Sequence, residues 1–229
     1  MEGVHRMKIA VDGPAGAGKS TIARLVAKHL GLRYVDTGAM YRTVTLAALR
    51  QGVDMGDEDA LMRVATSMDL NIVFQGEQGN GIYLDGEDVT GLIREPDVTA
   101  HVSTVSTHKK VREFIVALQD QIGRQGSVVM DGRDIGTVVM PDADWKIFLQ
   151  ATVEERARRR QQDLERRGAS VNVEELQEQI RRRDHLDSTR ENSPLRKADD
   201  AIEIDTTFLN VAEVVQKLLD LIQGEAGDV

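Results

Sequence analysis

The sequence contains no cysteine among its 229 residues. That absence excludes disulfides and thiolate metal sites, and it is compatible with a reducing cytoplasm. No apolar run approaches the length of a membrane-spanning helix, and the opening residues MEGVHR are too short and polar for a signal peptide. We therefore expect a soluble cytoplasmic protein with no membrane partner.

The sequence also has no excess of basic residues, and its formal net charge is −9 at pH 7. A nucleic-acid polymer requires a broad basic surface, so it is not expected as the main partner. Within residues 151–197, however, twelve Lys or Arg stand against ten Asp or Glu. Such local enrichment suits a small polyanion held at one site. The chain length suits one α/β domain with an insertion, or two small domains.

A short apolar strand at 9–11 runs directly into the glycine-rich segment 13–20, GPAGAGKS, and helical periodicity follows. This order matches the phosphate-loop pattern of Gly, four residues, Gly-Lys-Ser/Thr. The glycines let the backbone curl around an anion, and the helix adds its positive N-terminal end. A plain glycine turn does not need a Lys-Ser pair at that offset, so the pattern predicts binding of a nucleoside triphosphate.

The phosphate-loop pattern also assigns roles to single residues. Lys19 is expected to reach the β- and γ-phosphates, and Ser20 is expected to place its hydroxyl on Mg²⁺. Asp131 ends a buried-type strand at 127–131, where an aspartate commonly holds Mg²⁺ or its waters. The residues predicted to hold the triphosphate are Gly13, Pro14, Ala15, Gly16, Ala17, Gly18, Lys19, Ser20 and Thr21.

Beyond this loop, two predicted strands each end in a segment whose side chains suit the binding of a second substrate. In the first, DTGAMYR, Thr37 and Arg42 either meet that substrate or serve as a helix cap and a surface residue, and the strand and loop alone leave this open. In the second, DGRD, Arg133 should lie close to the phosphates and can hold one bidentately. Asp-Gly clusters also form plain turns, but we favour a functional Arg133.

Three short β-type runs interrupt the alternation of strands and helices. Asp85-Gly86, between two of them, is a strong hairpin signal. We therefore interpret about residues 70–95 as a small antiparallel insertion in a three-layer α/β fold of the P-loop NTPase type, with a parallel sheet. The runs cover residues 70–74, 82–84 and 87–89.

Two helices are expected after the insertion, at about 97–107 and 109–124. The second carries an apolar face at helical spacing. Arg112 lies off that face, so spacing alone favours an ordinary surface position for this residue.

The basic residues of 151–197 lie on two further predicted helices. The first begins with a capping box formed by Thr152 and Glu155, and the second begins at Asn172. The pair is either a solvated hairpin or a mobile lid that brings arginines over a transferring phosphoryl group and excludes water. Arginines in such positions accelerate phosphoryl transfer by roughly 10³ to 10⁵ in favourable cases.

The ordered motifs VDGPAGAGKST, DTGAMYR, KKVRE, DGRDIGTVV and RRRDHLDSTR resemble the bacterial cytidylate kinases over essentially the whole chain. The phosphate loop is shared by many NTPases, whereas this order, with a β insertion between DTGAMYR and DGRD, is specific to that family. The resemblance implies a nucleoside monophosphate kinase that transfers the γ-phosphoryl group of ATP to CMP or dCMP, with Mg²⁺. A monomer is the expected state.

The resemblance further implies which side chains meet the acceptor. Those expected at its phosphate are Thr37, Arg42 and Arg133. Those expected at the cytosine edge are Ser103, Arg112 and Asp134. Those expected to reach its ribose and phosphate from the lid are Arg183, Asp187 and Arg190. Thr37 stands where the family often has serine, so the hydroxyl is kept and a methyl group is added.

Catalysis is expected to rest on positive charge near the transferred group. The sequence leaves open which of Arg156, Arg159 and Arg160 reaches the phosphoryl group, and we favour the last two. The expected catalytic residues are Lys19, Arg133, Arg159, Arg160 and Arg190. The expected division of the chain is a core of 1–36, 125–152 and 198–229, an acceptor-binding region of 37–124, and a helical lid of 153–197.

Two alternatives remain open at this stage. A kinase of the same fold can act on UMP, AMP or another small acceptor. A non-catalytic nucleotide switch is less favoured, because the Asn-Lys-x-Asp string of guanine-specific switches is absent and an arginine-rich lid is hard to explain without phosphoryl transfer.

Overall fold

The computed structural model describes residues 6–74, 79–166, 168 and 171–225. Some of the predicted segments extend beyond these residues. Outside the described part lie residues 1–5 and 226–229 of the expected core, 75–78 of the insertion, and 167, 169 and 170 of the lid.

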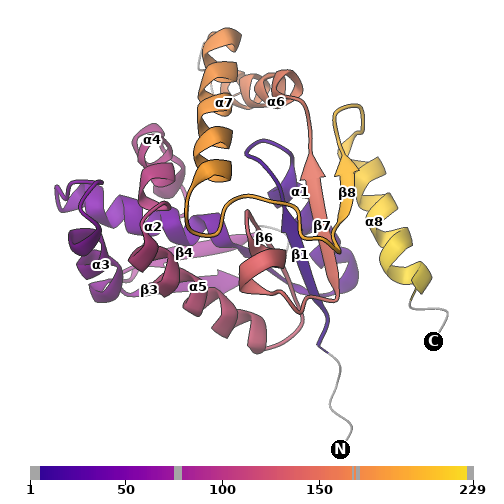
Figure 1. The fold of residues 1–229 in the computed structure, drawn as a ribbon, viewed down its shortest axis with the longest axis horizontal. Helices are drawn as coiled ribbons and strands as arrows, with labels where there is room; N and C mark the ends of the chain where they lie inside the picture. The colour runs from indigo at the N-terminus through magenta and orange to yellow at the C-terminus, as the bar shows by residue number, and fades with distance from the viewer. Residues whose placement is uncertain (1–5, 75–78, 167, 169–170, 226–229) are drawn as a thin grey trace, which may run out of the picture.

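Five parallel strands form the central sheet, in the order β2-β6-β1-β7-β8 (Figure 1). All residues of β6 are buried, as expected for a strand covered on both faces. Because the strands run the same way, their carboxyl ends meet at one edge, where ligands bind in sheets of this kind. The bounds are β1 Lys8–Asp12, β2 Arg33–Asp36, β6 Val128–Gly132, β7 Trp145–Gln150 and β8 Ile202–Asp205.

Helices cover both faces of this sheet. On one face, α1 (Lys19–Leu30) packs beside α8 (Val211–Glu225), and both share an apolar core with β1 and β7. On the other face, the short π-helical turn Ile135–Val139 packs on β6 and on α5 (Lys109–Arg124). The predicted three-layer arrangement around a parallel sheet is therefore confirmed.

A second group of elements lies beside the sheet, at the left of Figure 1. Its core is centred on α2 (Thr37–Arg50) and includes apolar residues from every helix of the group. The helices are α3 Glu58–Ser67, η2 Leu92–Arg94, α4 Pro96–Val105 and α5. The predicted antiparallel insertion is confirmed as β3 Leu70–Phe74, β4 Asn80–Leu84 and β5 Glu87–Asp88.

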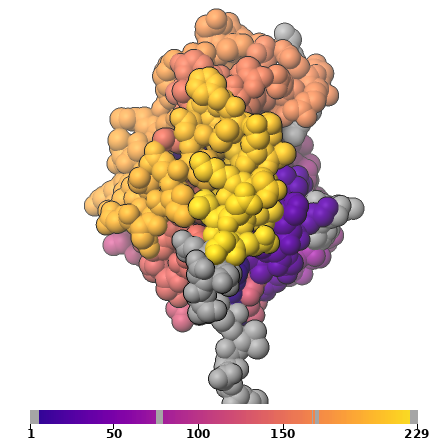
Figure 2. Space-filling view, turned by 90° about the vertical axis from the view of Figure 1, so that its right-hand side faces the viewer, coloured from indigo at the N-terminus to yellow at the C-terminus, as the bar shows by residue number. Residues whose placement is uncertain are grey.

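The helices α6 (Val153–Glu165) and α7 (Val173–Thr189) pack against each other above the carboxyl edge of the sheet (Figure 1). In Figure 2, which looks onto α8, these two helices form the upper end of the molecule. Asn172 caps α7, because its Oδ1 accepts the Glu174 and Glu175 amides. The capping box at Thr152 is only half formed: Thr152 Oγ1 accepts the Glu155 N–H, but the Thr152 N–H donates to Thr207 Oγ1 and the Glu155 carboxylate pairs with arginines. No helix in the described part of the chain is long and apolar enough to span a membrane.

Gly13 shows why the loop after β1 must begin with glycine. Its φ is +145°, and a Cβ atom there would lie 2.0 Å from the carbonyl oxygen of Leu149 on β7. Any side chain would push the two strands apart. The loop therefore approaches the neighbouring strand closely at the point where the phosphates are expected.

Candidate active site

The phosphate loop joins β1 to α1 at the carboxyl edge of the sheet. Lys19 opens α1, is buried, and donates its ammonium to the Pro14 carbonyl at 2.8 Å. Burial lowers the pKa of Lys19 well below its usual value, and the nearby Arg133 guanidinium lowers it further. A phosphate group beside this ammonium would compensate both effects, as the phosphate-loop pattern requires.

Asp131 lies directly across from the start of α1. Its Oδ2 accepts the Ser20 hydroxyl at 2.8 Å, and its Oδ1 accepts the Tyr34 hydroxyl at 2.7 Å. Burial, with a smaller contribution from Asp36, raises the pKa of Asp131 to about 6. A buried carboxylate and a hydroxyl oxygen side by side are a donor set that suits Mg²⁺ completed by phosphate and water oxygens.

Arg112 is buried, with 2% of its surface exposed, so the surface position favoured by spacing alone is wrong. Helical periodicity identifies the apolar face of a helix, so it does not predict the burial of an arginine whose charge is neutralised by a carboxylate inside the protein. Here one terminal nitrogen of Arg112 donates to Asp134 Oδ2, and another donates to the Ser106 carbonyl. The carboxylate therefore makes a buried position for Arg112 possible.

Asp134 is flanked by a second arginine, Arg190, which directly follows α7. Arg190 Nη2 lies 3.7 Å from Asp134 Oδ1 and is buried without a hydrogen-bond partner in the described part of the chain. Tyr41 lies against this group, because the Arg112 guanidinium lies 5.4 Å from the centre of its ring. The Tyr41 hydroxyl is also buried without a partner among the described residues. Unused donors of this kind indicate that the group is built to meet a ligand.

A second ion pair ties α7 to the end of β6. Arg133 Nε donates to Asp187 Oδ2 at 2.8 Å. Burial opposes ionisation of Asp187, but the guanidinium groups of Arg133 and Arg183 hold its pKa below the usual value. Thr37 lies at the same strand end and donates its hydroxyl to the Asp131 carbonyl at 2.6 Å.

Arg42 and Arg183 belong to a group of cations with few matching carboxylates. Burial, and then the proximity of other arginines, lowers the pKa of each to about 10. Arg42 donates to Thr99 Oγ1 at 2.8 Å, whereas the buried Nε of Arg183 has no partner in the described part of the chain. Arg160 contributes to both shifts and so belongs to the same group. Crowded guanidinium groups of this kind form a site for phosphate.

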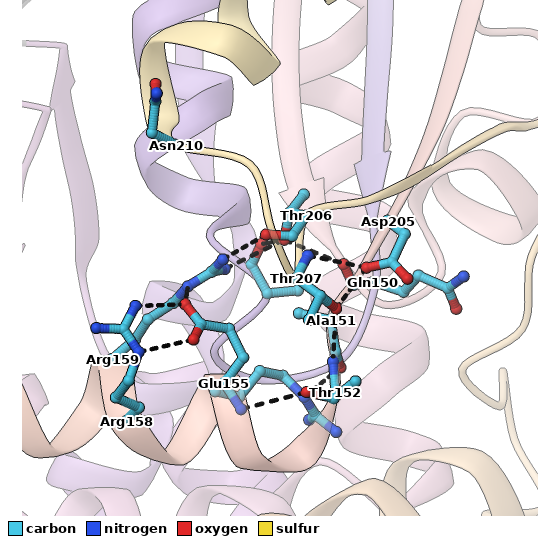
Figure 3. Close-up of polar contacts among 12 residues, drawn as sticks. Gln150, Ala151, Thr152, Glu155, Arg158, Arg159, Asp205, Thr206, Thr207 and Asn210 are labelled. Atoms are coloured by element: carbon cyan, nitrogen blue, oxygen red, sulfur yellow. Dashed lines mark hydrogen bonds and ion pairs between the residues drawn. The ribbon is translucent and has the colours of Figure 1, made fainter.

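The predicted pair Arg159 and Arg160 separates in the structure. Arg159 uses its three nitrogens on Glu155 Oε1 and on the hydroxyl and carbonyl oxygens of Thr206, as Figure 3 shows. Thr206 Oγ1 in turn lies 3.3 Å from the carbonyl oxygen of Ala17 in the phosphate loop. Arg159 therefore fastens α6 to the core, and Arg160 remains the exposed member of the pair.

Arg156, which the sequence left unassigned, is buried between the phosphate loop and α7. It donates to the Ala15 carbonyl at 3.0 Å and forms a bidentate pair with Asp184. Ser103 lies half-buried on α4, where its carbonyl accepts the Ser106 hydroxyl. The structure thus brings most of the predicted side chains to one edge of the sheet, while their individual roles stay predictions.

Three contributors to this edge were missed from the sequence. Tyr41 was quoted only as part of DTGAMYR, and Arg94, which pairs with Asp36 at 2.7 Å, follows no recognisable motif. Asp12 is the last residue of β1, and Asp131 is the next-to-last residue of the neighbouring strand β6. An aspartate that closes a buried-type strand beside a glycine-rich loop was the available signal for Asp12.

A comparison with solved structures finds this fold in a gluconokinase from Sinorhizobium meliloti 1021. The TM-score is 0.50 and the identity 13%, with 97% of this chain and 95% of that chain covered. At this identity the match shows the fold alone. Together with the phosphate loop at the strand ends, it shows a fold of the P-loop NTPase type.

The family follows from sequence comparison. The family model described as cytidylate kinase matches residues 9–224. A cytidylate kinase from Bacillus cereus (strain B4264) is 54% identical over 220 residues, covering 96% of this chain and 97% of the relative. One from Bacillus thuringiensis (strain Al Hakam) is 53% identical over 219 residues, with the same coverage. The chain belongs to the cytidylate kinase family, and the resemblance noted in its motifs is confirmed.

Proposed function

We propose that this enzyme transfers the γ-phosphoryl group of ATP to CMP or dCMP, giving ADP and CDP or dCDP. The observation that carries the proposal is the buried group of Arg112, Asp134 and Arg190, next to the backbone that Asp12, the residue before the phosphate loop, binds. We further propose that it acts in pyrimidine nucleotide metabolism, in the cytoplasm and as a monomer.

The chemistry of Arg112 and Asp134 fits the edge of cytosine. Cytosine offers a 4-amino donor and acceptors at N3 and O2, and a carboxylate beside a guanidinium supplies the matching acceptor and donors. Uracil carries a carbonyl oxygen at position 4, which would face the Asp134 carboxylate. The same pair therefore favours CMP over UMP, and Ser103 is proposed as a further contact to the base.

Thr37, Arg42 and Arg133 are proposed to hold the acceptor phosphate, with Arg183, Asp187 and Arg190 reaching its ribose and phosphate from the lid. In this proposal residues 37–124 form the acceptor-binding region and residues 153–197 form a lid. The ion pair between Arg133 and Asp187 supports the lid assignment, because it joins the helix α7 to the sheet edge. Closure would exclude water that otherwise hydrolyses ATP.

The transfer needs no covalent intermediate and no strong general base, because a monophosphate oxygen is already an adequate nucleophile. Residues 13–21 hold the ATP phosphates, and Lys19 places a positive charge where negative charge moves during transfer. Ser20 and Asp131 are proposed to hold Mg²⁺, Asp131 directly or through water. When bound, Mg²⁺ would neutralise phosphate charge, and the arginines align the two substrates.

A panel of acceptors tests the proposed substrate. The nucleotides CMP, dCMP, UMP and AMP are each supplied with ATP and Mg²⁺, and ADP formation is followed in a coupled assay. We expect kcat/KM for CMP to exceed that for AMP by about 100-fold or more, because a site that hydrogen-bonds one base leaves buried groups unpaired with another. Preference for AMP or UMP over CMP would contradict the proposal.

The contrast between Arg159 and Arg160 gives a second test. Arg160→Ala is expected to lower kcat about 10²-fold, since it removes a cation proposed to meet the transferred group. Steady-state kinetics at saturating ATP and CMP measures the change. Arg158→Ala is the matched control, because Arg158 lies exposed on the same helix and pairs with Glu155. Equal losses in the two variants would rule out a special role for Arg160.

A further inference from the structure

We propose that Asp12 is a positioning residue for the acceptor: it clamps the backbone that follows Asp134 and so holds Arg133 and Asp134 in place. This inference rests on the proposed function and deepens it. Asp12 acts through the segment 132–136, because its carboxylate accepts hydrogen bonds from the Ile135 and Gly136 amides.

The contact consists of two hydrogen bonds from consecutive amides. Asp12 Oδ1 accepts the Ile135 N–H at 2.8 Å, and Asp12 Oδ2 accepts the Gly136 N–H at 2.7 Å. Asp12 is buried, with 4% of its surface exposed. Both amides belong to the first turn of the π-helical segment, immediately after Arg133 and Asp134. The carboxylate therefore fixes the backbone next to both side chains.

A carboxylate is required at this position because two adjacent donors must be accepted at once. An asparagine offers one acceptor oxygen, and its amide nitrogen would face the second N–H. Burial raises the pKa of Asp12 to about 6, against the opposing effect of the two N–H donors. The charged groups that act on it are Asp134 and Lys19. A charge kept in so buried a place indicates that the two hydrogen bonds matter.

The rest of the segment is confined by close packing. A Cβ atom at Gly132 would lie 2.6 Å from the Ile135 side chain and 2.8 Å from Thr37 Oγ1. At Gly136 it would lie 3.2 Å from methylene carbons of Lys146 and 3.4 Å from Asp12 Oδ2. Close packing thus restricts the segment at Gly132 and Gly136, and the hydrogen bonds to Asp12 attach it to β1.

The position of Asp12 in the sheet links the contact with Ile135 and Gly136 to the phosphate loop. Asp12 is the last residue of the central strand and the direct neighbour of Gly13, the first glycine of the phosphate loop. The same strand end therefore starts the ATP-binding loop and anchors the backbone of the acceptor residues. We infer that the hydrogen bonds of Asp12 fix the position of the acceptor site relative to the phosphate loop, and so fix the distance between the two substrates.

The variant Asp12→Asn tests the inference in the full-length enzyme. We expect KM for CMP to rise about tenfold or more while KM for ATP changes by less than about threefold. The reason is that loss of one hydrogen bond lets the backbone next to Arg133 and Asp134 move. A general loss of structure would not separate the two constants. Equal increases in both constants, or an unchanged KM for CMP, would overturn the inference.

Asp144→Asn is the matched control. Asp144 Oδ2 accepts the Lys8 N–H at 2.7 Å, so it makes the same kind of contact at the opposite end of the same strand. Its KM for CMP and for ATP should each stay within about twofold of wild type, since the contact lies away from the carboxyl edge. A selective rise in KM for CMP in this control would also overturn the inference.

A second variant covers the case in which Asp12→Asn does not fold. Gly136→Ala keeps the carboxylate and presses the same segment against the methylene carbons of Lys146, 3.2 Å from the added Cβ, and against Asp12 Oδ2 at 3.4 Å. We expect KM for CMP to rise about threefold with KM for ATP unchanged, and no rise would overturn the inference. If the wild-type enzyme does not use CMP, the proposed substrate is wrong, and the same comparison is made with the acceptor that the panel identifies.

Discussion

Replacing Lys19 by methionine is expected to lower kcat by about 10³-fold or more, the largest single effect that the structure predicts. Methionine keeps the length of the side chain and removes its charge. Lys19 is buried at the start of α1, where its ammonium donates a hydrogen bond to the Pro14 carbonyl. Steady-state kinetics with saturating ATP and CMP measures the loss.

Lys28→Met provides the control for Lys19, because Lys28 lies exposed in the last turn of the same helix. Its kcat should remain within about twofold of wild type, as is usual for a surface substitution. Calorimetric titration of CMP separates binding from transfer. Retained CMP binding with lost turnover fits a role at the transferred phosphate, whereas full activity of Lys19→Met would refute that role.

Arg112→Ala is expected to lower kcat/KM for CMP about 10³-fold, with most of the loss in KM. The substitution removes the proposed donor to the cytosine edge and leaves the Asp134 carboxylate buried, with Arg190 at 3.7 Å as the remaining cation. Removing one partner of a buried ion pair also costs stability, so a thermal melt accompanies the kinetics. An unchanged KM for CMP would show that Arg112 does not read the base.

Arg124→Ala is the control for Arg112. Arg124 lies on the same helix but is exposed and pairs with Asp120 one turn earlier. Exposed pairs of this kind contribute little to stability, so kcat/KM should stay within about twofold. A comparable loss in both variants would indicate a general effect of removing an arginine from α5.

Local signals in the sequence were sufficient for much of this molecule. The phosphate loop, the caps at Thr152 and Asn172, and the strand ending at Asp131 each follow from a few neighbouring residues. Such features depend on backbone chemistry over one or two turns, and the structure has them within one residue of the expected positions. The parallel sheet with its antiparallel insertion follows from the order of these elements.

Local sequence signals do not predict contacts between residues that are far apart in the chain. Spacing on α5 placed Arg112 at the surface because its partner Asp134 lies 22 residues further along the chain. Arg159 looked suited to a phosphoryl group, but its nitrogens are occupied by Thr206, which is 47 residues away. Asp12 gives no hint in the sequence that it binds amides 123 and 124 residues later. Each of these contacts exists only after the sheet has formed.

The crowded arginines at the sheet edge also have a consequence for the empty enzyme. Arg42, Arg160 and Arg183 repel one another, and two of them are buried enough to lower their pKa values to about 10. Folding must therefore bring like charges together before any nucleotide arrives. Under the proposed function, phosphate-bearing ligands act as the missing counterions, so the native state should reach its full resistance to heat only with its substrates bound.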